Sequence, residues 1–195
     1  MKRALLACLL LTACGTAPHA VQAPATMMAA QGDSVGSYLS LEFAPTAAIA
    51  KRRDGTLKDL GFLDVSHAIP PRDPAVLHAT VAFFHQALTA EQVKLLEAHF
   101  KGKQENLAVS GWGVAGDQVA FMTVTGVDKA RVFLKDHAID GAMDDPHVTI
   151  GVSAANPRDV HGVPKLAQHP FTPLKVHATY QLYQPAQGTM TARWQ

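Results

Sequence analysis

The sequence predicts a single α+β domain whose core is built from antiparallel strands. Strand patterns occur in adjacent pairs, at 106–114 with 118–125 and at 174–184 with 189–194, and strands joined by short turns pair antiparallel. Helical patterns interrupt them too rarely for the strand–helix alternation of a parallel sheet. The 195 residues, 48% of them hydrophobic, are sufficient for one core without disulfide bonds.

The first 36 residues are expected to precede the fold. Met1-Lys2-Arg3 and the short apolar run after it are typical of a secretory signal, and the run is too short to span a bilayer. Leu11-Thr12-Ala13-Cys14-Gly15 resembles a bacterial lipobox, so we expect residues 1–13 to be removed and Cys14 to carry lipid. The alternative is a plain signal peptide that contains a cysteine. Residues 14–36, rich in Ala, Pro, Gln and Thr, are then a flexible tether.

Folded structure is expected to begin with the alternating run Ser37–Phe43, which is typical of a half-buried strand. Residues 44–73 give mixed signals: Asp54-Gly55 indicates a turn, and 57–65 indicates a short helix or an irregular segment. Residues 75–84 predict a buried strand. Thr89 is then expected to cap a helix that runs to about Phe100.

The second half of the chain predicts a hairpin, a helix and three further strands. The strands 106–114 and 118–125 meet at Ala115-Gly116-Asp117, and Asp128 is expected to cap a helix that reaches about His137. A polar loop then leads into a strand at 147–153. After a loop that contains Pro and His, the last pair of strands completes the domain.

Two copies of the pattern His-x-Thr-apolar lie in predicted strands, His78-Ala79-Thr80-Val81 and His147-Val148-Thr149-Ile150. Alternate residues of a strand face the same way, so each His and its Thr project from one face. The apolar neighbours point to the other face and anchor the strand in the core. Side by side, the two strands would bring two imidazoles and two hydroxyls together.

This set of groups suits the cleavage of a phosphodiester without a metal. A neutral imidazole takes a proton from water or a ribose hydroxyl, and a protonated imidazole gives one to the leaving oxygen. The hydroxyls of Thr80 and Thr149 can donate to the phosphoryl oxygens. The two histidines are expected to titrate as a coupled pair and to give a bell-shaped pH profile. The sequence leaves open whether His78 or His147 is the base.

The paired motifs resemble those of the 2H phosphoesterase superfamily. The stretch His147-Val148-Thr149-Ile150-Gly151 is especially similar to the second motif of the 2′,3′-cyclic nucleotide 3′-phosphodiesterase branch. The resemblance, over about residues 37–195, implies a two-lobed α+β fold of antiparallel sheets with flanking helices and a central cleft. It also implies catalysis by His78 and His147, phosphate binding by Thr80 and Thr149, no metal or other cofactor, and a 2′,3′-cyclic nucleotide or RNA-end phosphate as substrate.

Other features compete with this interpretation or add to it. A third copy of the motif, His177-Ala178-Thr179-Tyr180, lies in the penultimate predicted strand and could replace one of the pair. The cluster Lys51-Arg52-Arg53 could steer an anion or simply be solvated, and Trp112 or Phe84 could stack on a base or belong to the core. The remaining histidines show no zinc-ligand spacing.

The formal net charge of +1 gives no support for binding of long nucleic acid. We expect a monomer that acts on a small cyclic nucleotide or an oligonucleotide end. Its lipid would hold it in the cell envelope, at the periplasmic face of the outer membrane. Three alternatives stay open: a lipoprotein that binds a nucleotide or phosphate without hydrolysing it, a metal-dependent hydrolase, and a purely structural envelope protein.

Overall fold

The computed structural model describes residues 36–69, 71–158, 164–186 and 189–194. Its strands form one eight-stranded sheet in the order β1-β3-β6-β5-β4-β7-β8, with β2 paired to β6. β7 also pairs with β1, so the strands from β1 to β7 in this order form a closed ring. The strands, all paired antiparallel, are β1 (Ser37–Phe43), β2 (Phe62–Asp64), β3 (Leu77–Phe84), β4 (Gln104–Ala115), β5 (Val119–Thr125), β6 (His147–Ser153), β7 (His169–Ala186) and β8 (Thr189–Ala192).

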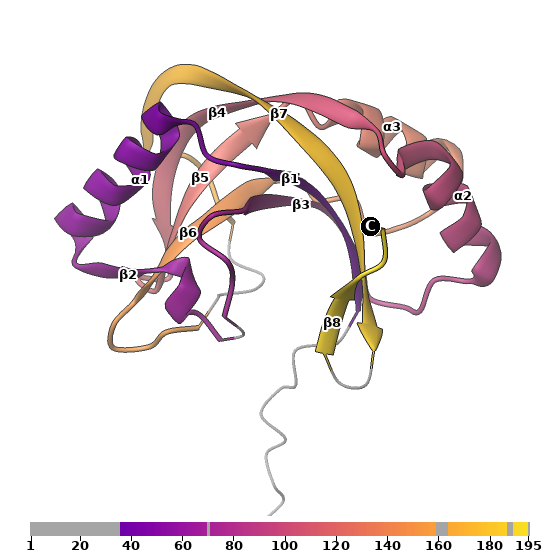
Figure 1. Cartoon of the computed structure of the whole chain (residues 1–195), viewed down its shortest axis with the longest axis horizontal. Coiled ribbons are helices and arrows are strands. Elements are labelled where there is room, and N and C mark those ends of the chain that lie inside the picture. Colours follow the sequence, from indigo (N-terminus) through magenta and orange to yellow (C-terminus); the bar gives the residue numbers. More distant parts are fainter. Residues whose placement is uncertain (1–35, 70, 159–163, 187–188, 195) are drawn as a thin grey trace, which may run out of the picture. The chain divides into compact units, whose positions relative to one another are not determined.

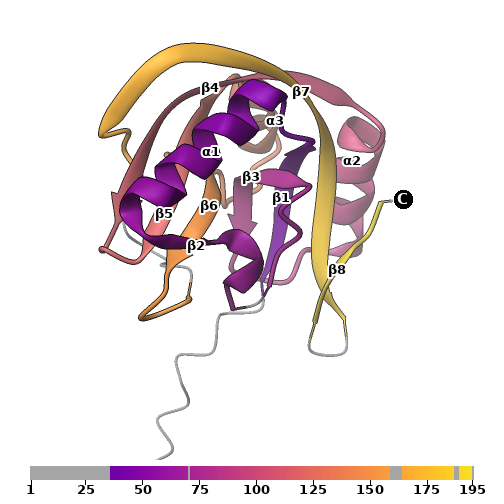
Figure 2. The ribbon, with the colours of Figure 1, turned by 60° about the vertical axis from the view of Figure 1, so that its left-hand side comes forward.

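Helices flank this sheet at its two ends. α1 (Ala47–Leu60) lies at one end of the strands, and α2 (Ala90–Phe100) and α3 (Asp128–Asp136) lie together at the other (Figure 1). A single 3₁₀ turn, η1 (Val65–His67), follows β2. The long strand β7 arches across the top of the sheet and descends beside β1 to meet β8 (Figure 2). The α+β class with an antiparallel sheet and flanking helices, predicted from the sequence, is confirmed.

One face of the sheet packs against the helices, and we call it the core face. Ala79 of β3 and Val148 of β6 belong to the same buried cluster as Ile49 of α1, Leu96 of α2 and Leu134 of α3. Burying a large aliphatic side chain contributes about 1.5–3 kcal/mol, so this cluster supplies most of the stabilisation that fixes the strands. The opposite face carries His78, Thr80, His147 and Thr149, and we call it the histidine face.

The expected turn at Asp54-Gly55 is wrong, because both residues lie inside α1. Thr46 caps the start of this helix through its hydroxyl, and Gly61 ends it in the left-handed conformation with a φ of 67°. A glycine inside a helix costs about 1 kcal/mol relative to alanine. Burial of Ile49 and Leu57 on the inner side of α1 outweighs that cost.

Local signals elsewhere predicted the elements closely. Thr89 and Gln92 form a reciprocal capping box at the start of α2, as the sequence suggested for Thr89. The hairpin between β4 and β5 turns through Gly116 and Asp117, both with positive φ, 57° and 54°. Two left-handed residues in succession are what a tight antiparallel hairpin requires. Both elements therefore follow from local chemistry alone.

Three boundaries differ from the expectation. β3 begins at Leu77, later than the expected 75. Asp128 is the first residue of α3, and the cap position is held by Val127 without a side-chain hydrogen bond, so the expected Asp128 cap is wrong. β7 spans 18 residues, because it pairs with β4, β1 and β8 along its length.

The predicted signal peptide, tether and lipidated Cys14 lie outside the described residues. Within the described ranges, no helix is long and apolar enough to cross a membrane.

Candidate active site

The two motif strands are neighbours in the sheet. β3 and β6 pair antiparallel, with Ala79 opposite Val148. These two side chains are buried on the core face, at 0% and 1% exposure, so the residues that flank them project from the histidine face. Because the chains run in opposite directions, the motif residues face each other in two pairs, His78 with Thr149 and Thr80 with His147.

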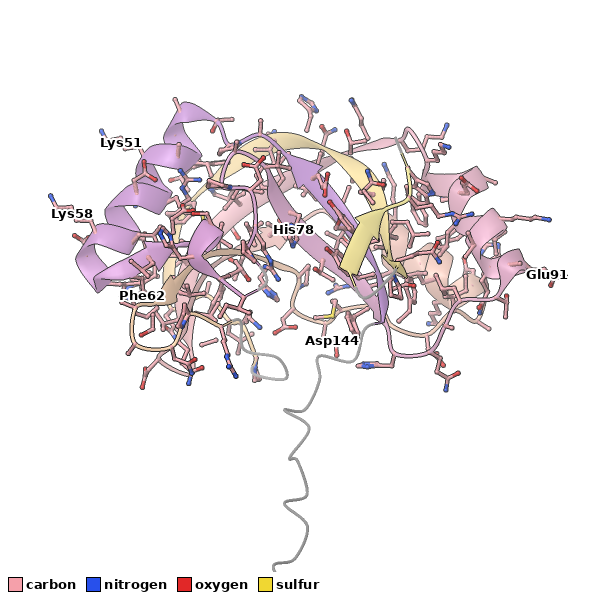
Figure 3. The ribbon with its side chains drawn as sticks, turned by 60° about the horizontal axis from the view of Figure 1, so that its bottom comes forward. Lys51, Lys58, Phe62, His78, Glu91 and Asp144 are labelled. Carbon is pink, nitrogen blue, oxygen red and sulfur yellow. The ribbon has the colours of Figure 1, made fainter. Side chains whose placement is uncertain are left out.

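This register places the two histidines on a diagonal across neighbouring strands. Diagonal neighbours in an antiparallel pair lie about 7–8 Å apart, and their Cβ atoms are somewhat closer. Two imidazoles at that separation can reach toward a single group between them. His78 lies near the middle of the underside of the molecule, between the end that carries α1 and the end that carries α2 (Figure 3).

The two motif strands are each held by a second neighbour in the sheet, β3 by β1 and β6 by β5. β3 and β6 share the single register pair at Ala79, whereas β1 pairs with β3 from Ser37 to Phe43. On the other side, β5 pairs with β6 from Val119 to Thr123. The positions of the two histidines are therefore set by β1 and β5 as much as by each other.

The imidazole of His147 is oriented by the backbone. Its Nδ1 lies 2.8 Å from the carbonyl oxygen of Asp145, and because a carbonyl only accepts, Nδ1 carries a hydrogen. Nε2 is then the nitrogen that exchanges a proton with a substrate or water. The ring of Phe121 meets the imidazole edge to face, with 6.0 Å between the ring centroids. Phe121 is fully buried and lies opposite Thr149, so it forms an apolar wall beside the pair.

His78 has an acidic neighbour, Glu42, and an aromatic neighbour, Tyr38, both on β1. Glu42 of β1 lies directly opposite His78, and its Oε1 accepts a hydrogen bond from the Tyr183 hydroxyl of β7 at 2.5 Å. Tyr183 stacks on Tyr38 with 4.6 Å between ring centroids, and the Tyr38 centroid lies 6.1 Å from that of His78. Glu42 and Tyr38 therefore lie on the side of His78 that faces away from β6.

Both tyrosines are neutral donors at ordinary pH. Burial raises the pKa of Tyr38 to about 12, an effect that Arg72 opposes and Glu42 reinforces. Burial, followed by the hydrogen bond to Glu42, raises the pKa of Tyr183.

The two threonines differ in exposure. Thr149 is 5% exposed, whereas Thr80 is half-buried and lies opposite Ser40 of β1. Both therefore lie at the base of the histidine face, where a hydroxyl can donate to an anion held above the strands.

The segment 164–168 packs on the histidine face over β4 and β5. A Cβ on Gly111 would lie 2.7 Å from an atom of this segment, and one on Gly113 would lie 3.0 Å away, so the close approach needs glycine. The backbone N–H of Lys165 donates to the Asp145 carboxylate at 2.6 Å, and Lys165 is only 6% exposed. Asp145 thus holds His147 through its carbonyl and the segment through its carboxylate.

The third motif does not join the pair. His177 and Thr179 lie on β7, both exposed, opposite Asn106 and Gln104 of β4. β1 separates β7 from β3, so His177 occupies neither position next to β6.

The other sequence candidates lie away from the histidines. Lys51 and Arg52 line an open hollow with Trp112 and Leu174, and Lys51 projects outward from α1, away from His78 (Figure 3). Trp112 lies opposite Met122 on the core face and stacks on His169, with centroids 3.9 Å apart. Phe84 is 3% exposed in the core. Among the described residues, no group of three His, Cys, Asp or Glu side chains is placed to hold a metal ion.

Sequence reasoning missed five residues around the histidines. Their contacts join segments far apart in the chain: Glu42 and Tyr183, for example, are 141 positions apart. One signal was present, since the alternation in β1 gives it a polar face. The missed residues are Tyr38, Glu42, Asp145, Lys165 and Tyr183.

Comparison with known proteins finds no match by sequence and a weak likeness to solved structures. No protein-family model and no curated protein sequence matches the chain. Among solved structures, the crystal structure of Escherichia coli LigT in complex with 3′-AMP is similar at 18% sequence identity and a TM-score of 0.41. The likeness covers 80% of this chain and 94% of that one.

Proposed function

We propose that the chain is a metal-independent phosphodiesterase that hydrolyses cyclic phosphodiesters, most specifically 2′,3′-cyclic nucleotide or RNA-end phosphates. The observation that carries the proposal is the register of β3 and β6, which puts His78 opposite Thr149 and Thr80 opposite His147. Two independent His-x-Thr motifs thereby form one group of four side chains on one face. The resemblance of the motifs to those of 2H phosphoesterases supplies the reaction class.

The diagonal spacing suits an in-line displacement at phosphorus. The attacking and leaving oxygens lie on opposite sides of the phosphorus atom, so acid and base must approach from two directions. Two imidazoles on such diagonal positions, about 7–8 Å apart along the strands, can each reach one of these oxygens within hydrogen-bond distance. A pair of histidines on adjacent positions of one strand would face opposite sides of the sheet.

The proposed reaction has one displacement step. The base imidazole removes a proton from water, the water oxygen forms a bond to phosphorus, and one ring P–O bond to the ribose breaks. The acid imidazole gives its proton to the released ribose oxygen, so the products are a ribose hydroxyl and a phosphate monoester. Hydroxyl donors from Thr80 and Thr149 stabilise the charge that develops on the non-bridging oxygens.

The test is turnover of 2′,3′-cyclic AMP by the purified full chain in EDTA. His78→Ala and His147→Ala should each lower kcat/KM by about 10²–10⁴-fold, the usual contribution of general acid–base catalysis. His177→Ala is the matched control, because it removes the histidine of the third motif on an exposed strand position and should leave turnover unchanged. All variants should unfold at the wild-type temperature.

Three results would overturn the proposal. Tight binding of the cyclic nucleotide without hydrolysis would indicate a binding protein. Loss of activity in EDTA, with recovery on adding a divalent cation, would indicate a metal-dependent hydrolase. Full activity of His78→Ala or His147→Ala would remove that residue from the reaction.

We propose further that the chain is exported and carries lipid on Cys14. Support comes from the basic start, the short apolar run and the small residues that surround this cysteine. Metabolic labelling with palmitate in a bacterial host should mark the wild-type chain and leave Cys14→Ser unlabelled. Cys8→Ser is the control, since this residue would be removed with the signal, and it should be labelled normally. An unlabelled wild-type chain would contradict the lipid anchor.

A further inference from the structure

An open hollow lies between α1 and the paired strands β4 and β7, away from the two histidines. It measures about 520 Å³, a size that is usual for small-molecule sites. One wall is α1, which contributes Lys51, Arg52 and Gly55, and the other carries Trp112 of β4 and Leu174 of β7. Trp112 projects from the core face, so the hollow and the proposed active site belong to opposite faces of the sheet.

The wall formed by α1 carries positive charge. Lys51 and Arg52 are both exposed, and Asp59 is the acidic side chain among the residues that line the hollow. Within the part of the chain that the structure describes, neither cation forms an ion pair. Arg52 lies over the ring of Phe171 instead, with its guanidinium carbon 4.7 Å from the ring centroid. This contact fixes the cation and uses no hydrogen-bond donor, so its N–H groups remain available to an anion.

The wall formed by the strands is apolar and aromatic. Trp112 is half-buried, and its indole stacks on the imidazole of His169, with 3.9 Å between the ring centroids and 19° between the ring planes. Leu174, which is also half-buried, lines the hollow beside it. The stack fixes the orientation of the indole. A fixed indole next to an aliphatic side chain is a surface on which a planar ring packs well.

Gly55 leaves space at the helical wall. It lies inside α1, although glycine weakens a helix relative to alanine. A Cβ at this position would have no neighbouring heavy atom within 4 Å, so packing of the protein itself does not require glycine here. Without a side chain at this position, a ligand in the hollow can approach the backbone of α1 closely.

We propose that this hollow is a second ligand site, which binds a planar aromatic ring that carries a phosphate monoester, such as a nucleoside 5′-monophosphate. The phosphate, which has nearly two negative charges at neutral pH, lies against Lys51 and Arg52. The ring packs on Trp112 and Leu174 and passes over Gly55. The site is separate from the histidine face, and binding there does not depend on the proposed phosphodiesterase activity.

The test is a titration of the full chain with 5′-AMP, followed by tryptophan fluorescence. Trp112 lines the hollow, whereas Trp194, the second tryptophan of the chain, is only 4% exposed. The wild type should show a saturable change that Trp112→Phe loses. Adenosine and inorganic phosphate, which each carry one half of the ligand's chemistry, should need at least about tenfold higher concentrations. No saturable change with 5′-AMP, or equal binding of either half alone, would overturn the proposal.

Two lysines of α1 separate a contact in the hollow from a general effect of charge. Lys51→Ala removes a cation that lines the hollow and should raise the Kd of 5′-AMP about tenfold. Lys58→Ala is the matched control, because Lys58 is also exposed on α1 but does not line the hollow (Figure 3). At physiological salt its Kd should stay within about twofold of wild type. Equal effects of the two substitutions would contradict a phosphate contact at Lys51.

Two further kinds of variant locate the ligand. Gly55→Leu places a side chain in the open space and should abolish the saturable change, while the unfolding temperature stays at or above that of wild type because leucine favours the helix. His78→Ala and His147→Ala should keep the wild-type Kd at Trp112, whatever their effect on hydrolysis. Wild-type binding by Gly55→Leu, or loss of the fluorescence change in either histidine variant, would place the ligand elsewhere and overturn the proposal.

Discussion

Gly151 lies where β6, β2 and α1 meet, and replacing it with alanine tests how tightly this end of the fold is packed. It is four positions after His147 and pairs with Asp64 of β2. A Cβ at this position would lie 2.2 Å from Cδ2 of Leu57 and 2.5 Å from the carbonyl oxygen of Leu63. Real Cβ atoms essentially never come within 3.0 Å of another heavy atom in this way.

The expected magnitude follows from which of these atoms can move. The Leu57 side chain can turn, but it is 7% exposed and has packed neighbours. The Leu63 carbonyl belongs to the backbone of β2, and its displacement disturbs the pairing with β6. Overpacking of this kind costs about 1–3 kcal/mol, and alanine recovers about 0.5–1 kcal/mol of the entropy cost of glycine in a strand. Gly151→Ala should therefore lose about 1 kcal/mol of the free energy of unfolding, or about 2–4 °C in Tm.

Urea denaturation followed by circular dichroism measures this change. Gly55→Ala is the matched control, because Gly55 lies inside α1 and a methyl group added there would have no neighbouring atom within 4 Å. There the same substitution should stabilise the protein by about 0.5–1 kcal/mol. A Gly151→Ala protein as stable as wild type, or two variants that shift in the same direction, would refute the packing at this junction.

Two further predictions concern stability. Thr89→Ala removes the capping hydroxyl from Gln92 N at the start of α2 and should cost about 1 kcal/mol in urea denaturation; an unchanged midpoint would show that the capping box contributes nothing. Tyr38 has its pKa raised to about 12, so in the folded protein it stays protonated between pH 10 and 12 while the unfolded chain ionises. The contribution of Tyr38 to the free energy of unfolding is therefore fully present below pH 10 and is lost as the pH rises toward 12. Between pH 9 and pH 11, the free energy of unfolding of Tyr38→Phe should fall by about 1 kcal/mol less than that of the wild type. Equal losses in the two proteins would contradict the burial of the phenol.

The elements that the sequence predicted well are those with a local chemical cause. Alternation of polar and apolar residues defined β1, and Thr89 indicated the start of α2, where Gln92 completes the capping box in the structure. Gly116 and Asp117 supplied the backbone conformation of the hairpin. Each signal acts within a few residues, so no knowledge of the partner strands was needed.

The elements that were missed depend on distant partners. Gly55 indicated a turn, yet packing of Leu57 against the sheet keeps the chain helical through it. The length of β7 follows from its three partner strands. At the site, the faces of His78 and His147 were predictable from strand periodicity. Their neighbour Glu42 was not, because only the register of β1 against β3 places it there.

The most direct test of the central claim compares His78→Ala, His147→Ala and the double variant for hydrolysis of 2′,3′-cyclic AMP. If the two histidines act as acid and base in the same step, the step needs both of them. Each single variant should therefore lose most of the activity. The double variant should then be about as active as the weaker single variant. A double variant whose loss equals the product of the two separate losses, or a single variant with the wild-type rate, would contradict a joint action of the two histidines.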